Sequence, residues 1–202
     1  MDGNIKGQNE DLAVLLRKYP FLRIRNVFTH KQCFHGKSQN LKYNHYNSFK
    51  GTGWEGLWKR YLERLFHLYD EKWSKDTRKS FVFYQIKEKF GTMRIYTSFY
   101  DSDEDLEYIA EMLSYYTCYQ CGKEPRDEQG RRVIWFSRGY ILPYCEECAK
   151  KFGRIDDYDK ETQDEFSTIL HTKDGKFRIR YAEKDGWLVK GTTERIDDEK
   201  ED

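Results

Sequence analysis

Four of the five cysteines in this 202-residue sequence fall into two Cys-x-x-Cys pairs, which carry its strongest chemical signal. Cys118 and Cys121 form the first pair, and Cys145 and Cys148 follow after 23 intervening residues, 122 to 144. Each pair can place two thiolates on one side of a metal ion, and four thiolates match the tetrahedral coordination of structural zinc. The sequence therefore predicts one Zn²⁺ bound by these four side chains.

Two disulfides or a redox-active cysteine pair are the alternatives to this zinc site. The first residues, MDGNIKGQNEDL, lack the basic-then-apolar order of a secretion signal, so persistent disulfides are not expected. A thioredoxin-type site would need only one pair. Because four thiolates leave no coordination position for water or substrate, the zinc is expected to be structural.

The segments around the two pairs predict a small zinc unit. Gly122 permits the tight turn that ends the first pair, and two strands over 132–136 and 140–144 form a hairpin. A helix over 145–152 then carries the second pair in its first turn. A knuckle, a hairpin and a helix start, in this order, are typical of a treble-clef or zinc-ribbon unit.

An amphipathic helix is the clearest element before the zinc unit, because large apolar residues recur at three- and four-residue spacing from Trp54 to Tyr69. Two strands, 81–86 and 93–96, then form a hairpin with a turn at 87–91, and a helix capped at 101–103 runs through 113. Upstream, the pattern predicts a short helix from Asn9 or Asp11 to just before Pro20, a strand over 21–28 and a long polar loop over 30–53.

The C-terminal part predicts a β-meander of three strands, 166–172, 177–183 and 187–193, separated by two Asp-Gly turns. An acidic segment over 154–165 is expected to link this meander to the zinc unit. The expected fold class is α+β, in four parts. These are a basic α+β module (1–116), the four-cysteine unit (117–153), the C-terminal meander (154–194) and an acidic tail (195–202).

The net charge of +1 conceals two oppositely charged halves. Residues 1–100 hold 19 bases and 9 acids, whereas residues 101–202 hold 17 bases and 26 acids. The basic half could bind nucleic acid or an acidic protein, or the halves could neutralise each other within the fold. No run of about 20 apolar residues is present, so no membrane-spanning helix and a cytoplasmic location are expected.

Basic and aromatic residues are mixed in the basic half of the chain, and some of them are candidate partner-binding residues. They are Arg23, Arg25, Lys37, Lys42, Tyr43, Tyr46 and Lys50. Such mixing suits stacking on single-stranded nucleic acid, although it also arises by chance in a chain with 17% aromatic residues.

Several weaker groups have alternative interpretations. His30, Cys33 and His35, with His45 beyond them, could hold a second metal, but their spacing matches no standard cluster. Cys33 as a nucleophile lacks an acid partner, and His67 is expected to be a half-buried structural histidine. The acidic residues Asp101, Asp103, Glu104 and Asp105 either bind a cation or favour a helix N-terminus through its dipole.

The order of motifs resembles a family of small phage- and prophage-associated proteins. The residues that carry the resemblance are Tyr19-Pro20, Gly51-Thr52-Gly53-Trp54, Lys87 to Tyr96 (KEKFGTMRIY) and Thr117-Cys118-x-x-Cys121-Gly122. The resemblance covers about residues 12–152 and implies a bacterial or phage context without an assigned activity. The meander from about 166 and the longer basic segment from His30 to Lys50 depart from the family pattern.

The expected function is that of a non-enzymatic, zinc-stabilised accessory protein that binds a macromolecule. A protein partner is favoured, and a host defence component is one candidate. The first alternative is a nucleic-acid-binding protein that uses the basic half, and the second is a metal-dependent nuclease. No nucleotide-binding or hydrolase signature is present, and no histidine lies between 68 and 170 to hold a catalytic metal beside the zinc.

Overall fold

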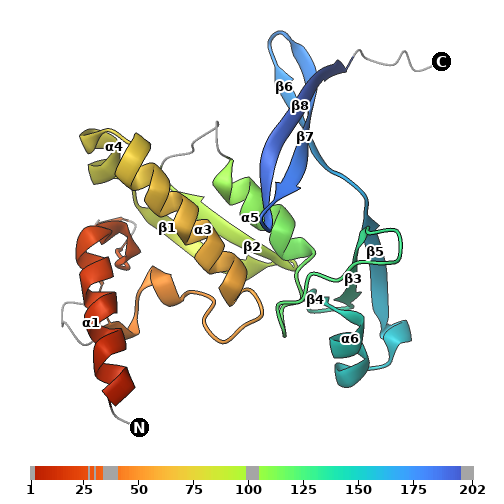
Figure 1. The fold of residues 1–202 in the computed structure, drawn as a ribbon, viewed down its shortest axis with the longest axis horizontal. Coiled ribbons are helices and arrows are strands. Elements are labelled where there is room, and N and C mark those ends of the chain that lie inside the picture. Colours follow the sequence, from red (N-terminus) through yellow and green to blue (C-terminus); the bar gives the residue numbers. More distant parts are fainter. Residues whose placement is uncertain (1–2, 27, 30, 34–40, 99–104, 197–202) are drawn as a thin grey trace.

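The computed structural model describes residues 3–26, 28–29, 31–33, 41–98 and 105–196, and side chains from residue 11 onward. Helix and sheet are mixed, as the sequence predicted. A long helix lies across a two-stranded sheet at the centre, the cysteine-bearing segments lie to one side, and a three-stranded meander projects from the body (Figure 1). Helix α1 (Gly3–Lys18) lies on the opposite side of the centre from the cysteines.

The central helix α3 (Glu55–His67) buries Leu57, Trp58, Tyr61, Leu62 and Leu65. This confirms the amphipathic pattern, because these positions share one helical face. A single π-helical turn over Leu68–Lys72 extends α3 before the chain turns at Trp73.

The hairpin of β1 (Phe83–Lys89) and β2 (Thr92–Thr97) is longer than the sequence predicted. Its register pairs Lys89 with Thr92, so only Phe90 and Gly91 form the turn. Helix α5 (Leu106–Tyr115) lies beside β2, where the Ser114 hydroxyl accepts a hydrogen bond of 2.8 Å from the Met93 amide. α3, the hairpin and α5 thus enclose one core.

The strand expected over 21–28 is not formed in the part of this segment that the structure describes. Instead, Pro20–Leu22 is a 3-10 turn, and isolated bridges join Arg23 to Asn44 and Arg25 to Gln32. Phe21 and Leu22 are both buried, which an alternating strand with one solvent face would not allow.

A short helix, α4 (Lys75–Ser80), precedes the hairpin and was not predicted. All six of its side chains are polar and none is buried, so it lacks an apolar face. Its start is fixed by Ser74, whose hydroxyl accepts a hydrogen bond of 3.1 Å from the Thr77 amide.

The cysteine-bearing part contains the sheet β4-β3-β5 and helix α6 (Glu146–Phe152). β3 (Arg132–Ser137) and the short β4 (Pro143–Tyr144) form the expected hairpin. The prediction that residues 154–165 form a linker is wrong, because β5 (Tyr158–Gln163) pairs with β3 along its whole length. β5 was missed because its exposed polar side chains carry no burial signal.

The predicted meander is confirmed as β6 (Phe166–Thr172), β7 (Gly175–Lys184) and β8 (Trp187–Ile196). Its root belongs to the common core through Phe166, Tyr181 and Trp187. The buried Asp105 carboxylate, at the start of α5, accepts a hydrogen bond from the Tyr181 hydroxyl and pairs with Lys190. The meander is therefore anchored at one end, while its far end extends into solvent.

A network of ion pairs around the fully buried Arg132 of β3 joins the cysteine-bearing part, the central helix and the meander. Its guanidinium lies 3.0 Å from Glu124 and 2.9 Å from Glu183 of β7. Arg60 of α3 also pairs with Glu124, and Arg126 with Glu183, each at 2.5 Å. The cysteine-bearing part, the central helix and the meander are thus tied together by charge as well as by apolar packing.

None of the described helices combines the length and the apolar character that a membrane crossing requires.

Candidate metal centre and an adjoining surface

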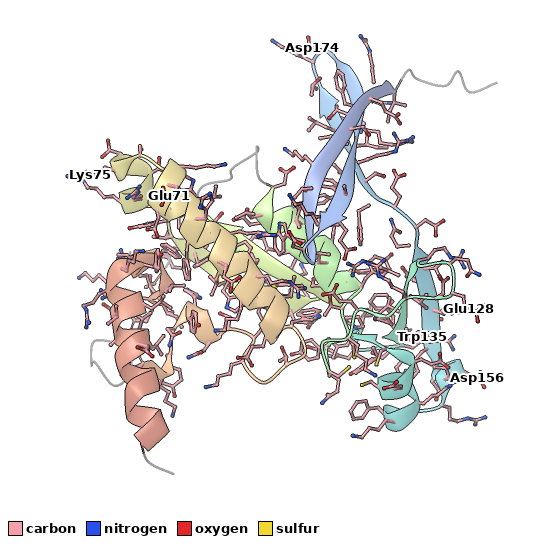
Figure 2. The ribbon with its side chains drawn as sticks, viewed as in Figure 1. Glu71, Lys75, Glu128, Trp135, Asp156 and Asp174 are labelled. Carbon is pink, nitrogen blue, oxygen red and sulfur yellow. The ribbon has the colours of Figure 1, made fainter. Side chains whose placement is uncertain are left out.

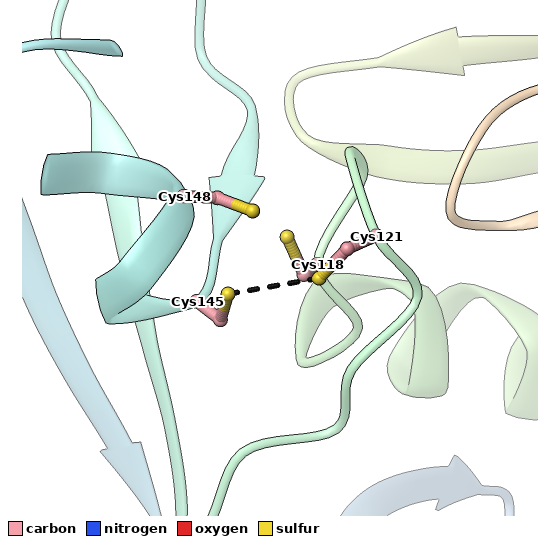
Figure 3. A group of neighbouring side chains, drawn as sticks. All are labelled: Cys118, Cys121, Cys145 and Cys148. Carbon is pink, nitrogen blue, oxygen red and sulfur yellow. Dashed lines mark hydrogen bonds between the residues drawn. The ribbon is translucent and has the colours of Figure 1, made fainter. Parts of the chain in front are cut away.

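The four cysteines predicted from the sequence converge on one point, with all four Sγ atoms within 4.8 Å of one another (Figure 3). Cys121 Sγ and Cys145 Sγ lie 3.7 Å apart. A tetrahedron of thiolates with metal–sulfur bonds of about 2.3 Å has sulfur–sulfur edges of about 3.8 Å. A disulfide would require about 2.05 Å, and all four cysteines are free. The group can therefore hold a metal ion.

The first pair lies on a tight turn that directly follows α5. The Cys118 amide donates to the Lys123 carbonyl at 2.8 Å, and the Gly122 amide donates to the Cys118 carbonyl at 2.9 Å. Gly122 has a φ of +76°, which a side chain would strain, so the glycine after the second cysteine closes the turn.

The second pair is presented by α6. Cys145 stands immediately before the helix, and its carbonyl accepts a hydrogen bond from the Ala149 amide, so Cys148 follows within the first turn. Cys145 and Cys118 are buried, and burial raises the pKa of the Cys118 thiol. Since a metal ion stabilises the thiolate, its binding would offset this effect of burial.

The loop before α3 packs directly on the first cysteine pair. The Gly53 amide donates to the Tyr119 carbonyl at 2.6 Å, and the buried Trp54 indole donates to the Thr117 carbonyl at 2.9 Å. A Cβ on Gly53 would lie 2.2 Å from the Cys118 carbonyl oxygen. Only glycine therefore fits, and the central helix starts against the turn that carries Cys118 and Cys121.

An exposed apolar surface adjoins the cysteine-bearing part at the tip of the β1–β2 hairpin. It comprises Phe90 (65% exposed), Tyr140 (73%) and Ile141 (39%), and we call it the tip surface. Together with Glu88, Lys89 and Gly139, these residues line a shallow cavity of about 370 Å³. The tip surface thus combines residues from the hairpin turn and from the β3–β4 loop.

Direct contacts hold the two contributors together. The Tyr140 hydroxyl donates to Glu88 at 2.7 Å, and the other oxygen of Glu88 accepts the Gly91 amide at 2.9 Å. A Cβ on Gly91 would lie 3.0 Å from the Phe136 ring and 3.3 Å from Ile141. The hairpin turn therefore rests on the strand and loop that lead from the first cysteine pair to the second.

Those predicted partner-binding residues that the structure describes do not lie with the cysteines or with the tip surface. Arg23 and Arg25 are half-buried beside the 3-10 turn, and Lys42 and Lys50 are exposed. Lys59 of α3 lies over the Tyr46 ring at 3.1 Å, and Lys42 lies over Tyr43 at 5.2 Å, so both tyrosines already contact a cation. Lys37 lies outside the described residues.

The structure describes the weaker candidate groups only in part. His30 and His35 lie outside the described residues, as do Asp101, Asp103 and Glu104, while Cys33 is exposed. His45 packs edge-on against Phe83 at 5.3 Å, and burial lowers its pKa to about 4. His67 is exposed, so the expectation of a half-buried histidine is wrong. Asp105 is engaged by Tyr181 and Lys190, as described above.

The sequence singled out neither Phe90 nor Tyr140, and it marked Gly53 only as part of the motif Gly51-Thr52-Gly53-Trp54. A signal for Phe90 was present, since the turn sequence Phe-Gly lacks the asparagine or aspartate that usually precedes glycine there. No comparable signal marks Tyr140 or Gly53, because their importance arises from contacts between distant segments.

Comparison of the chain with models of protein families, with curated proteins and with solved structures found no match.

Proposed function

We propose that this chain is a non-enzymatic, zinc-stabilised binding protein that engages a protein partner through the tip surface. The observation that supports this proposal is the backbone conformation of the exposed residue Phe90. This residue has a φ of +53°, which is strained for a bulky residue, and yet its ring is 65% exposed. Strain without a packing gain in the folded chain is expected where a residue serves a binding function.

The surroundings of Phe90 favour a protein partner. Exposed aromatic side chains that rest on a rigid support are typical of the residues that dominate binding energy in protein interfaces. Tyr140 and Ile141 extend the apolar area, and Lys89, 5.1 Å from the centre of the Phe90 ring, adds a cation at its rim. The complementary partner surface would have an apolar pocket bordered by carboxylates.

The metal has a positioning role in this proposal. Zinc is the ion of choice for four cysteine thiolates at these distances, and the order of knuckle, hairpin and helix start supports a treble-clef unit. By joining the two cysteine pairs, the ion fixes both ends of the segment that carries Phe136, Tyr140 and Ile141. Loss of the metal would loosen the support of the hairpin turn and so the tip surface.

The test is affinity purification from extracts of the native host with three baits, namely the parent, Phe90→Ser and the matched control Leu170→Ser. Leu170 is 48% exposed on the meander, so its change removes a similar apolar side chain elsewhere. We expect a protein that the parent and the control retain and that Phe90→Ser loses at least about tenfold. Equal retention by all three baits would contradict the proposal.

Nucleic-acid binding by the basic half is the second candidate. The same purification includes nuclease treatment of the extract as a separate arm. If the captured protein disappears after that treatment, nucleic acid bridges it to the bait, and the alternative is favoured. The nuclease alternative stays a prediction, since within the described residues only the four cysteines form a group of three or more metal-ligand side chains. The phage context and a host defence partner also stay predictions.

A further inference from the structure

A second cavity, of about 370 Å³, lies far from the cysteines, between the 3-10 turn at Pro20–Leu22, the π-helical turn and α4. We call it the basic cavity. Its lining residues are Pro20, Phe21, Arg25, Tyr69, Lys75, Arg78, Lys79 and Phe81. Half of these side chains are cationic, and the other half are apolar or aromatic.

Among the residues that the structure describes, no carboxylate lines this cavity. The nearby Asp70 accepts hydrogen bonds of 2.7 Å from both Lys18 and Tyr19, so it is engaged outside the cavity. Asp76 is 95% exposed and lies 3.8 Å from Lys79. Positive charge gathered in a concave site raises the local concentration of anions, so the basic cavity is suited to an anionic ligand.

One cation of the cavity is already held in place. The Arg78 Nε donates to the Trp73 carbonyl at 3.0 Å, and Nη2 donates to the Asp70 carbonyl at 2.7 Å. Its guanidinium also lies 5.4 Å from the centre of the Tyr69 ring. These contacts fix the plane of the group and leave the Nη1 donors for a ligand. A guanidinium fixed in this way binds a phosphate with little further loss of side-chain freedom.

Pro20 and Tyr69, both half-buried, give the cavity an apolar side, and the rings of Phe21 and Phe81 in its lining are buried. Phe21 and Phe81 meet edge to face at 5.1 Å, and Tyr69 lies 5.3 Å from Phe21. The volume of the cavity lies within the range of small-ligand sites and far exceeds what a bare phosphate ion needs. A ligand that fills it therefore carries a flat, weakly polar group as well as the anion.

We infer that the basic cavity binds a nucleotide unit, with its phosphate at Arg25, Lys75 and Arg78 and its base against Pro20 and Tyr69. The unit can be a free nucleoside monophosphate or one residue of a single-stranded nucleic acid. This site is independent of the tip surface, since the two share no residue.

The test is calorimetric titration of the full chain at low salt with AMP, with adenosine and with a 5′-phosphorylated single-stranded oligonucleotide. We expect saturable binding of AMP at one site, and binding of adenosine that is at least about tenfold weaker because it lacks the phosphate. Tighter binding of the oligonucleotide than of AMP would identify a nucleic acid as the source of the unit, and equal affinity would identify the free nucleotide. Absence of saturable binding of both phosphorylated ligands would overturn the inference.

Two charge-reversal variants distinguish binding at a specific site from nonspecific attraction of an anion to a basic protein. Lys75→Glu places an acid in the first turn of α4, where the helix dipole tolerates it, so the fold is expected to persist. Lys173→Glu makes the same change in charge at the far turn of the meander. Lys75 is labelled on α4 in Figure 2, and the neighbouring Asp174 marks the far turn. We expect Lys75→Glu to weaken AMP binding at least about tenfold and Lys173→Glu less than about twofold. Equal weakening by both variants, or none by Lys75→Glu, would overturn the inference.

Discussion

Under the proposed function, Phe90 serves binding at the expense of local stability. Phe90 and Gly91 both have positive φ, at +53° and +75°, as the two central residues of a tight hairpin turn do. Asparagine adopts this conformation with less strain. We therefore expect Phe90→Asn to raise the free energy of unfolding by about 1 kcal/mol while removing partner binding.

Denaturant titration of Phe90→Asn, together with the purification described above, checks this prediction. A variant that is less stable than the parent, or one that still binds the partner, would show that the Phe90 ring serves the fold rather than an interface.

Gly53 offers a test of the contact between the central helix and the turn of the first cysteine pair. Because a Cβ there would lie 2.2 Å from a backbone oxygen that cannot move independently, we expect Gly53→Ala to lower the free energy of unfolding by about 3 kcal/mol. Gly56 is the matched control, since it lies in α3 with nothing within 4 Å of its Cβ position. Gly56→Ala is expected to stabilise the chain by about 1 kcal/mol. Similar effects of the two changes in urea titrations would argue against the close contact.

His45 makes stability depend on pH. Burial lowers its pKa from 6.5 to about 4, so the unfolded chain takes up a proton before the folded chain does as the pH falls. Stability is therefore lost between pH 6.5 and pH 4, by at most about 3 kcal/mol, and the loss is complete below the folded pKa. His45→Phe keeps an aromatic ring beside Phe83 and is expected to flatten this part of the profile. Identical pH slopes for parent and variant in thermal unfolding would refute the assignment.

At the scale of elements, Arg132 joins β3 to β7 and to the segment after the first cysteine pair. Its side chain is 2% exposed and contacts two carboxylates, Glu124 and Glu183. Arg60 and Arg126 still pair with these carboxylates when Arg132 is removed. The change nevertheless removes two charged contacts of a buried side chain and leaves a cavity, so we expect Arg132→Ala to cost about 3 kcal/mol of stability. Arg138, which pairs with Asp159 in solvent, is the control, and its change to alanine is expected to cost less than about 1 kcal/mol. The comparison requires chemical unfolding of both variants, and equal costs would contradict the role given to Arg132.

The elements that could be predicted from the sequence are those that bury one face or end in a diagnostic turn. The central helix follows from its apolar spacing, the meander from its two Asp-Gly turns, and the metal-binding group from the spacing of four cysteines. Each of these signals is local, so one sequence suffices to detect it.

The elements that escaped prediction lack such a local signal. β5 is held by backbone pairing with β3, and α4 buries no side chain, so neither shows a periodic pattern. Apolar and basic residues alternate after Pro20, as in a strand. The segment forms a 3-10 turn instead, because Phe21 packs into a cluster with Phe81 and Phe83. The tip surface could not be predicted either, because it requires a hairpin turn and a loop about 50 residues later to meet, as Glu88 and Tyr140 do with a separation of 52.

At the scale of the whole molecule, the opposite charges of the two halves are used in two ways. Some basic residues of the first half pair with acids of the second, as Arg60 does with Glu124 and Arg94 with Glu111, each at 2.5 Å. Others line the basic cavity, where no described carboxylate joins them. Part of the charge asymmetry thus joins the two halves through ion pairs, and part lies where we infer that an anionic ligand binds.

The two proposals place two separate binding surfaces on the molecule. The tip surface depends on the cysteine-bearing part, whereas the basic cavity is built from the other end of the central helix and from α4. Metal binding should therefore matter for the first surface and be nearly irrelevant to the second.

The most direct measurement for this account is the metal content of freshly purified, untagged protein, determined by elemental analysis for the parent, Cys148→Ser and Cys33→Ser. We expect about one zinc ion per chain in the parent and in Cys33→Ser, because Cys33 is exposed and lies outside the four-cysteine group. Cys148→Ser is expected to hold less than half as much. Fewer than about 0.5 zinc ions per chain in the parent, or an unchanged content in Cys148→Ser, would contradict the zinc-stabilised platform on which the proposed function depends.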